Sequence, residues 1–84
     1  MNRQEILTSI KRDIVSFENG KTLETLTSNR AIAARDIFLP MIEKMDDTWL
    51  RKNWDIDIYK IAVLENGLPS MKRVQRLYPE LLNK

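Results

Sequence analysis

The sequence predicts an all-α fold, a small bundle of four or five helices with a helix-turn-helix at its C-terminal end. Apolar residues recur three or four positions apart along most of the chain, which is the spacing of one face of an α-helix. No segment alternates apolar and polar residues over several positions, so no sheet is expected. The 84 residues are 43% hydrophobic and 31% charged, a composition typical of one folded domain, and residues 1–84 are therefore expected to form a single helical domain.

The first helix is predicted over residues 3–18, and Asn19-Gly20 closes its pattern. Four apolar residues share one helical face at spacings of three and four: Leu7, Ile10, Ile14 and Phe17. The same spacing is that of a coiled-coil seam, although it lasts for only about two heptads. Packing of this face onto the rest of the domain is the first interpretation, and homodimerisation through it is the alternative.

A second long helix is predicted from about Asn29 to Met45, after a helical turn over Thr22 to Ser28. Its apolar stripe consists of Ala31, Ala34, Phe38, Met41 and Met45. Pro40 interrupts this segment, and a proline inside a regular helix removes one hydrogen bond and clashes with the preceding turn, at a cost of about 3 kcal/mol. Because the stripe keeps its phase across Pro40, the sequence favours one kinked helix over two separate ones.

Trp49, Trp54 and Tyr59 lie within eleven residues of a chain that has only six aromatic residues. Asp46-Asp47-Thr48 supplies candidate N-cap residues for a short helix that begins just before Trp49. Large aromatic side chains stabilise the core of a small domain, which is the first interpretation of this cluster. Because tryptophan and tyrosine also dominate protein interfaces, an aromatic anchor for a partner protein is the alternative.

Residues 55–79 predict a helix-turn-helix. Apolar residues at helical spacing run from Ile58 to Leu64, and Asn66-Gly67 supplies the left-handed residue that commonly ends a helix. Pro69-Ser70 then predicts an extended pair that leads into an N-cap, because proline disfavours helical geometry in the residue before it. The second helix is expected to place Met71, Val74 and Leu77 inward and Lys72, Arg73, Gln75 and Arg76 outward.

The net charge of +2 is unevenly distributed along the chain. Residues 1–59 carry nine basic and ten acidic side chains, whereas residues 60–84 carry five basic and two acidic ones. On the second helix, arginine can fork onto guanine or phosphate and Gln75 can pair with an adenine edge, while lysine and the helix N-terminus can bind phosphate. The candidate DNA-binding residues are therefore Lys60, Ser70, Lys72, Arg73, Gln75 and Arg76.

The joint Gly67-Leu68-Pro69-Ser70, followed by Val74, Arg76 and Tyr78, resembles the small helix-turn-helix repeats that accompany homing endonucleases and occur in phage and mobile-element proteins. Those repeats also carry a tyrosine in their first helix, a position that Tyr59 matches here. The resemblance is confined to the last third of the chain. It implies DNA binding through the second helix, with no catalysis by the segment itself.

The composition argues against several classes of site. The chain contains no cysteine and no histidine, which excludes disulfides, thiolate metal sites and histidine-based catalysis. The acidic pairs Asp46-Asp47 and Asp55/Asp57 lack the alternating spacing and the glycine of a calcium loop. Since no Gly-rich phosphate loop or clustered catalytic carboxylates are found either, we expect no enzyme activity, no metal and no cofactor.

The longest apolar run, Ile61 to Leu64, has only four residues, so no membrane span is expected. The first residues lead into an amphipathic pattern and not into the apolar core of a signal peptide. A cytoplasmic location is therefore expected.

The sequence predicts a small non-catalytic DNA-binding protein, a regulator of the kind found in phages and mobile elements, with double-stranded DNA as its partner. The alternative is a protein-interaction module, an adaptor or inhibitor of a host protein, that binds through an apolar and aromatic helical face. Its candidate partner-binding residues are Leu7, Ile10, Ile14, Phe17, Trp49 and Trp54. The two hypotheses differ in whether the exposed surface carries a basic face or an apolar and aromatic patch.

Overall fold

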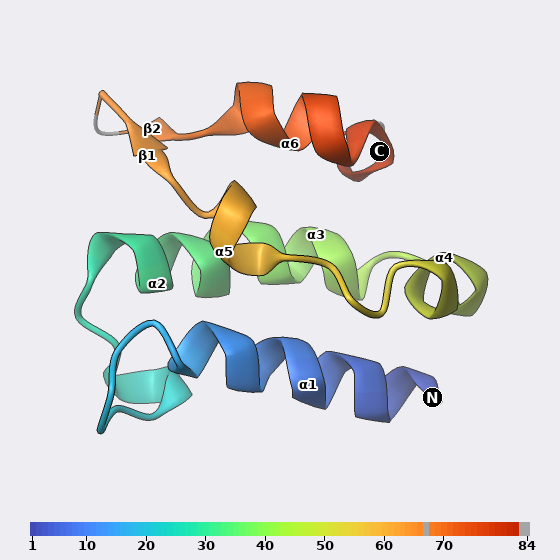
Figure 1. Ribbon diagram of the computed structural model, residues 1–84, viewed down its shortest axis with the longest axis horizontal. Helices are drawn as coiled ribbons and strands as arrows, with labels where there is room; N and C mark the ends of the chain where they lie inside the picture. The colour runs from blue at the N-terminus through green and yellow to red at the C-terminus, as the bar shows by residue number, and fades with distance from the viewer. Residues whose placement is uncertain (67, 83–84) are drawn as a thin grey trace.

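The chain folds into packed helices with a short hairpin near its C-terminal end (Figure 1). The computed structural model describes residues 1–66 and 68–82. The helical elements are α1 (Arg3–Val15), η1 (Leu23–Thr25), α2 (Asn29–Ala33), η2 (Ala34–Phe38), α3 (Leu39–Glu43), α4 (Asp47–Lys52), α5 (Ile58–Ile61), α6 (Met71–Leu77) and η3 (Pro79–Leu81). The described residues are mostly helical, which confirms the all-α fold class.

α1 packs a row of isoleucines into the core. Ile6, Ile10 and Ile14 are spaced four apart, and none of them is more than 1% exposed. Leu7 and Phe17 are partly buried against the same core. The packing interpretation of this face is confirmed. The alternative of homodimerisation is wrong for Ile10 and Ile14, because their side chains are covered by the domain itself and are not accessible to a second chain.

Residues 29–43 form one continuous helical segment, as the phase of the apolar stripe predicts. Its middle section, η2, is a π-helix that lies just before Pro40, and the N–H of Leu39 donates to the carbonyl oxygen of Ala34, five residues back. In a regular α-helix the proline ring clashes with the carbonyl four residues before it. The wider π-turn gives that ring room, so the helix passes through the proline without breaking.

The helices share one hydrophobic core, in which Phe38 is the largest fully buried side chain. Figure 1 shows α1 running beside the row formed by α2 and α3, with α4 at one end of both. α5 contacts both α1 and η2, and it also contacts α6, which lies at the far side of the molecule. α5 therefore connects α6 to the core.

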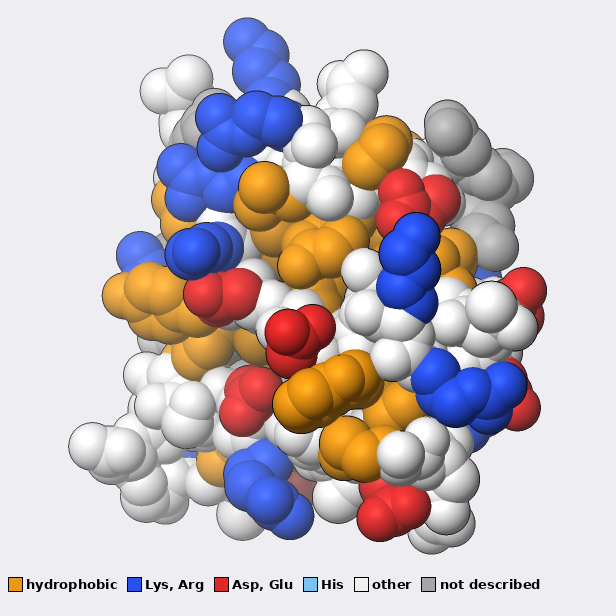
Figure 2. Space-filling view, turned by 45° about the vertical axis from the view of Figure 1, so that its right-hand side comes forward, with side chains coloured by type: hydrophobic (Ala, Val, Ile, Leu, Met, Phe, Trp, Pro, Cys, Tyr) orange, Lys and Arg blue, Asp and Glu red, His pale blue; other side chains and the backbone are white. Residues whose placement is uncertain are grey.

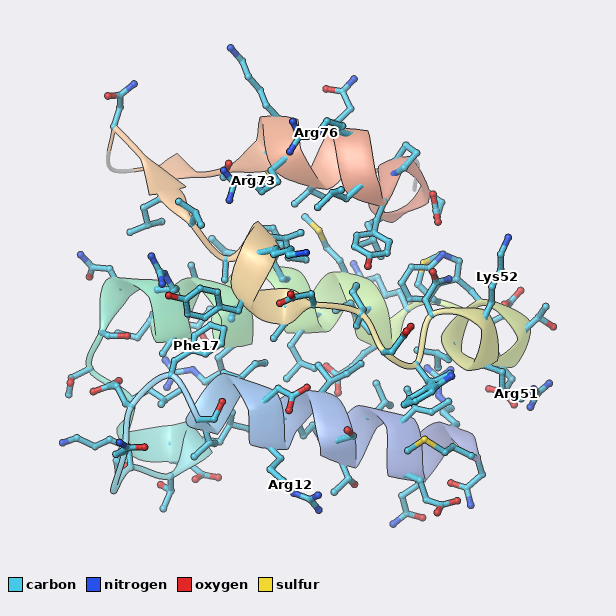
Figure 3. The ribbon with its side chains drawn as sticks, in the orientation of Figure 1. Arg12, Phe17, Arg51, Lys52, Arg73 and Arg76 are labelled. Atoms are coloured by element: carbon cyan, nitrogen blue, oxygen red, sulfur yellow. The ribbon has the colours of Figure 1, made fainter. Side chains whose placement is uncertain are left out.

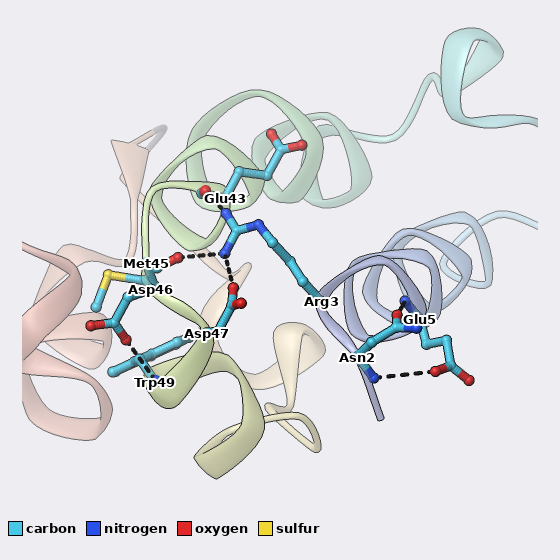
Figure 4. A network of polar contacts seen from close by, with 8 residues as sticks. All are labelled: Asn2, Arg3, Glu5, Glu43, Met45, Asp46, Asp47 and Trp49. Carbon is cyan, nitrogen blue, oxygen red and sulfur yellow. Dashed lines mark hydrogen bonds and ion pairs between the residues drawn. The ribbon is translucent and has the colours of Figure 1, made fainter.

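Arg3, at the start of α1, ties three segments together (Figure 4). Its guanidinium donates to the carbonyl oxygens of Glu43 and Met45, the second at 2.7 Å, and its Nη1 atom lies 3.2 Å from Oδ1 of Asp47. Carbonyl groups at the end of a helix have no partner inside it, so Arg3 supplies donors that α3 lacks. The same side chain fixes the end of α3 and the start of α4 relative to α1.

The segment after α5 differs from the prediction. The helix predicted through Leu64 ends at Ile61, and Leu64–Glu65 (β1) pairs in antiparallel fashion with Leu68–Pro69 (β2). The two strands are joined by a two-residue loop in which Asn66 has a φ of +54°. Asn-Gly is the preferred pair for such a hairpin turn, which needs the same left-handed backbone as a helix end. The predicted left-handed conformation of Gly67 lies outside the described residues.

The hairpin leads directly into α6. The N–H of Ser70 donates to the carbonyl oxygen of Val63 at 2.7 Å, which continues the pairing of the strands. Leu64 and Pro69 face each other between this bond and the turn, at a position where an antiparallel pair forms no hydrogen bond. The missing N–H of proline therefore costs the pair nothing. The sequence predicts no sheet, and the described residues form no strand pair beyond this one.

Replacing Arg3 with alanine is expected to lower the free energy of unfolding by about 1–2 kcal/mol, because carbonyl groups at the end of α3 lose a charged donor. Urea unfolding followed by circular dichroism measures this difference. Arg12→Ala, in the last turn of the same helix, is the matched control and should change the value by no more than about 0.5 kcal/mol. Equal effects of the two substitutions would contradict the role assigned to Arg3.

Candidate nucleic-acid interface

α6 is attached to the domain by one row of side chains. Ser70, Val74 and Tyr78 are spaced four apart; the first two are at most 1% exposed and Tyr78 is partly buried. The Tyr78 ring meets Trp49 edge to face, with the ring centroids 6.2 Å apart, and burial raises the pKa of the tyrosine hydroxyl. Trp49 in turn donates from Nε1 to Oε1 of Glu80 at 2.9 Å. The contacts of this row with the rest of the domain fix the position of α6.

Ser70 and two apolar residues of α6 are not placed as the sequence predicts. Ser70 is the N-cap residue of α6, as expected, but it is buried, so the expectation that its side chain contacts DNA is corrected. Met71 and Leu77 are 38% and 40% exposed and flank the inward row instead of forming it. The hairpin causes this change, because it fixes the backbone of Ser70 against Val63 and so sets which side of α6 faces the core.

The outer face of α6 carries Lys72, Gln75 and Arg76, and all three are exposed. Their spacing of three and four places them side by side on the helix surface. Among the side chains that the structure describes, no carboxylate forms an ion pair with Lys72 or Arg76. The positive charge of this face is therefore available to an anionic partner.

Arg73 and Lys60 join α6 to α5. Arg73 is partly buried and donates from Nη1 to the carbonyl oxygen of Lys60 at 2.9 Å. The Lys60 side chain is 70% exposed and lies 3.9 Å from Oδ2 of Asp57, a surface pair that contributes little to stability. Of the six predicted DNA-binding residues, Ser70 is buried and Arg73 is partly buried. The other four are exposed: Lys60, Lys72, Gln75 and Arg76.

Basic side chains gather on one part of the surface. Figure 2 shows Lys and Arg side chains at its upper left, at the level of α6 and α5. Figure 3 shows Arg73 and Arg76 on α6, at the opposite edge of the molecule from Arg12 on α1. Arg30 is not among the residues predicted from the sequence, and its guanidinium lies over the Tyr59 ring, 4.5 Å from the ring centroid. Arg30 is distant from α5 in the chain, so no local pattern could have revealed this contact.

An acidic hollow borders the basic surface. Asp13, Asp55 and Asp57 line a depression of about 310 Å³, together with Phe17 and Tyr59. In Figure 2, Asp and Glu side chains lie below the basic group, near the middle of the same face. Phosphate is repelled by this hollow and attracted by the neighbouring basic side chains.

The two tryptophans have different surroundings. Trp49 packs against the core and bonds to Glu80, so the core interpretation holds for it. Trp54 is 51% exposed and lines an open hollow of about 460 Å³ with Met1, Ile6 and Arg51. Of the six predicted partner-binding residues, Trp54 is the one with an exposed side chain.

No protein-family model matches the chain, and comparisons with curated proteins and with solved structures also found no match. In the part of the chain that the structure describes, no helix has the length and apolar character needed to cross a membrane. No three acidic side chains of that part are grouped so that they could hold a metal ion.

Replacing Glu80 with glutamine is expected to destabilise the protein near neutral pH and to have less effect in acid. The hydrogen bond from Trp49 holds the pKa of Glu80 below its ordinary value. A lowered pKa in the folded state stabilises the protein above the pKa of the unfolded chain, about 4.3, and this contribution is lost as the pH falls through the folded pKa. Urea unfolding of both proteins across that range is the measurement; a difference that is constant with pH would rule out the charge of Glu80 as its cause.

Proposed function

We propose that this chain is a small non-catalytic DNA-binding protein that places α6 in the major groove of double-stranded DNA. The observation that supports this best is the division of α6 into two sides. Its inward row, Ser70, Val74 and Tyr78, is held by the domain, and Lys72, Gln75 and Arg76 are exposed on the other side. A helix that is attached along one row can enter a groove with its opposite face leading.

Each exposed side chain of α6 has a chemically matched group on DNA. Arg76 can donate to both O6 and N7 of guanine, and Gln75 can pair with the N6 and N7 edge of adenine. Lys72, near the start of the helix, suits a phosphate. The seven residues of α6 span about 10 Å, so few base pairs are within reach and much of the affinity must come from phosphate contacts.

In this proposal α5, the hairpin and α6 take the parts of a helix-turn-helix, with a hairpin in place of the tight turn. Arg73 sets the angle between the two helices through its bond to the carbonyl oxygen of Lys60. The exposed side chain of Lys60 can then bind a phosphate that flanks the groove. The role we propose is that of a regulator, which acts by occupying DNA.

The acidic hollow restricts how DNA can approach. Asp13, Asp55 and Asp57 line the hollow beside Tyr59, and a phosphate backbone over them would be repelled. A phosphate is favoured beside Lys72 and Arg76 and disfavoured over these three aspartates. The neighbouring charges of opposite sign therefore favour one orientation of the protein in the groove.

The double substitution Lys72→Ala and Arg76→Ala is expected to weaken DNA binding and to flatten its salt dependence. Loss of the Lys72 phosphate contact reduces the slope of log K against log salt by about 0.9, and loss of the Arg76 base contact weakens binding further. Fluorescence anisotropy of a mixed-sequence duplex at about 50 and 200 mM salt measures both quantities. Arg12→Ala, which removes a charge from α1 at the opposite edge, is the control. Unchanged binding by the double variant would remove α6 from the mechanism.

A second candidate function is a protein-interaction module that binds a host protein through Trp54. The observation that favours it is the half-exposed indole beside Met1 and Arg51, because tryptophan and arginine are the residues most enriched in interface hot spots. Affinity capture with wild-type and Trp54→Ala proteins, followed by mass spectrometry, tests this function. A partner retained by both proteins equally would exclude Trp54 as the anchor.

A further inference from the structure

Arg30 is held at the surface by an aromatic side chain. Its guanidinium carbon lies 4.5 Å from the centroid of the Tyr59 ring, within the range of a cation–π interaction. The Tyr59 ring also meets Phe17 edge to face, with the centroids 5.2 Å apart and the planes at 87°. Phe17 packs against the core, so the ring that supports Arg30 is itself supported. A guanidinium placed in this way loses little conformational freedom when it binds a ligand.

Arg30 borders the acidic hollow through Tyr59, but it forms no ion pair with the carboxylates described there. Among the side chains that the structure describes, no carboxylate forms an ion pair with it. Cation–π contact leaves the N–H groups at the edge of a guanidinium plane free to donate, and that edge can bind phosphate bidentately. Arg30 therefore has the geometry and the charge of an anion-binding group.

Arg30 is connected to the proposed DNA-binding surface through α5. Tyr59, on which it stacks, is the neighbour of Lys60, and the carbonyl oxygen of Lys60 accepts the hydrogen bond from Arg73. These contacts link α2 to α5 and α5 to α6, and each of the three elements carries a basic side chain. Figure 2 shows several Lys and Arg side chains close together at its upper left, with Asp and Glu side chains below them.

We infer that Arg30 is a DNA-phosphate contact, so that the DNA-binding surface spans α2, α5 and α6. This inference rests on the proposed function. In this arrangement α6 enters the major groove, and Arg30 binds a phosphate of the DNA strand beside that groove. Two separated points of attachment compensate for the shortness of α6, because each phosphate contact adds affinity independently of base sequence.

The test is the salt dependence of DNA binding by Arg30→Ala. Binding of a mixed-sequence duplex is measured by fluorescence anisotropy at about 50 and 200 mM salt, for the wild type, Arg30→Ala, Arg30→Gln and Arg12→Ala. Loss of one phosphate contact should reduce the ratio of the two affinities by about 3-fold, for every duplex sequence tested. Arg30→Gln keeps a polar side chain without the charge and should give the same result, which keeps the test valid if the alanine variant is unstable.

The outcomes separate this inference from the proposed function. A reduced ratio for both Arg30 variants, with the ratio of Arg12→Ala unchanged, supports the phosphate contact. Ratios for the Arg30 variants equal to those of the wild type would overturn the inference, and binding lost in the Lys72→Ala and Arg76→Ala variant would then leave the proposed function intact. Lowered thermal stability without a change in the ratio would assign Arg30 to folding alone and also overturn it. No binding by the wild type at the lower salt would overturn both.

Discussion

The position of α6 depends on the burial of a single helical turn, α5, which packs between α6 and the core. Ile58, Ile61 and Ala62 are at most 2% exposed, and burying an isoleucine side chain stabilises a fold by about 1.5–3 kcal/mol. With residues 58 and 61 directed inward, the two residues between them point outward. Tyr59 then meets Arg30, and the backbone of Lys60 is presented to Arg73. The basic surface is thus a consequence of how one apolar turn packs.

The N-terminal half could be predicted because its elements are long and periodic. The core-facing side of α1 could be predicted from the spacing of its apolar residues alone, although Ile6 and not Leu7 is fully buried. The row of side chains that contains Ile6 and the row that contains Leu7 are adjacent on α1, and only the packing of the neighbouring elements decides which row faces the core. Pro40 could be assigned to a continuous helix because the apolar stripe kept its phase across it. Local spacing is sufficient where one helical face meets one core.

The C-terminal third could be predicted only in part, because its residue types are typical of both a helix end and a hairpin turn. Asn66 adopts a positive φ in both a helix end and a hairpin turn, so the pair Asn-Gly does not distinguish them. The apolar run that ends at Leu64 was too short to separate a helix from a strand. The exposure of Lys72, Gln75 and Arg76 followed from helical periodicity, whereas the stacking of Arg30 on Tyr59 depends on tertiary packing that no local pattern contains.

The π-turn before Pro40 also fixes the direction in which the side chains after it point from the helix axis. One additional residue in a helical turn rotates all that follows by about 100° relative to an unbroken α-helix. Arg30 lies before this turn, and α5 and α6 are connected to the chain after it. Deleting one residue between 34 and 38 would turn the buried side chain of Ile42 out of the core. It would also rotate α3, and the elements that follow α3 in the chain, relative to α2. The π-turn therefore fixes the orientation of Arg30, which lies before it, relative to the basic side chains of α5 and α6, which come after it.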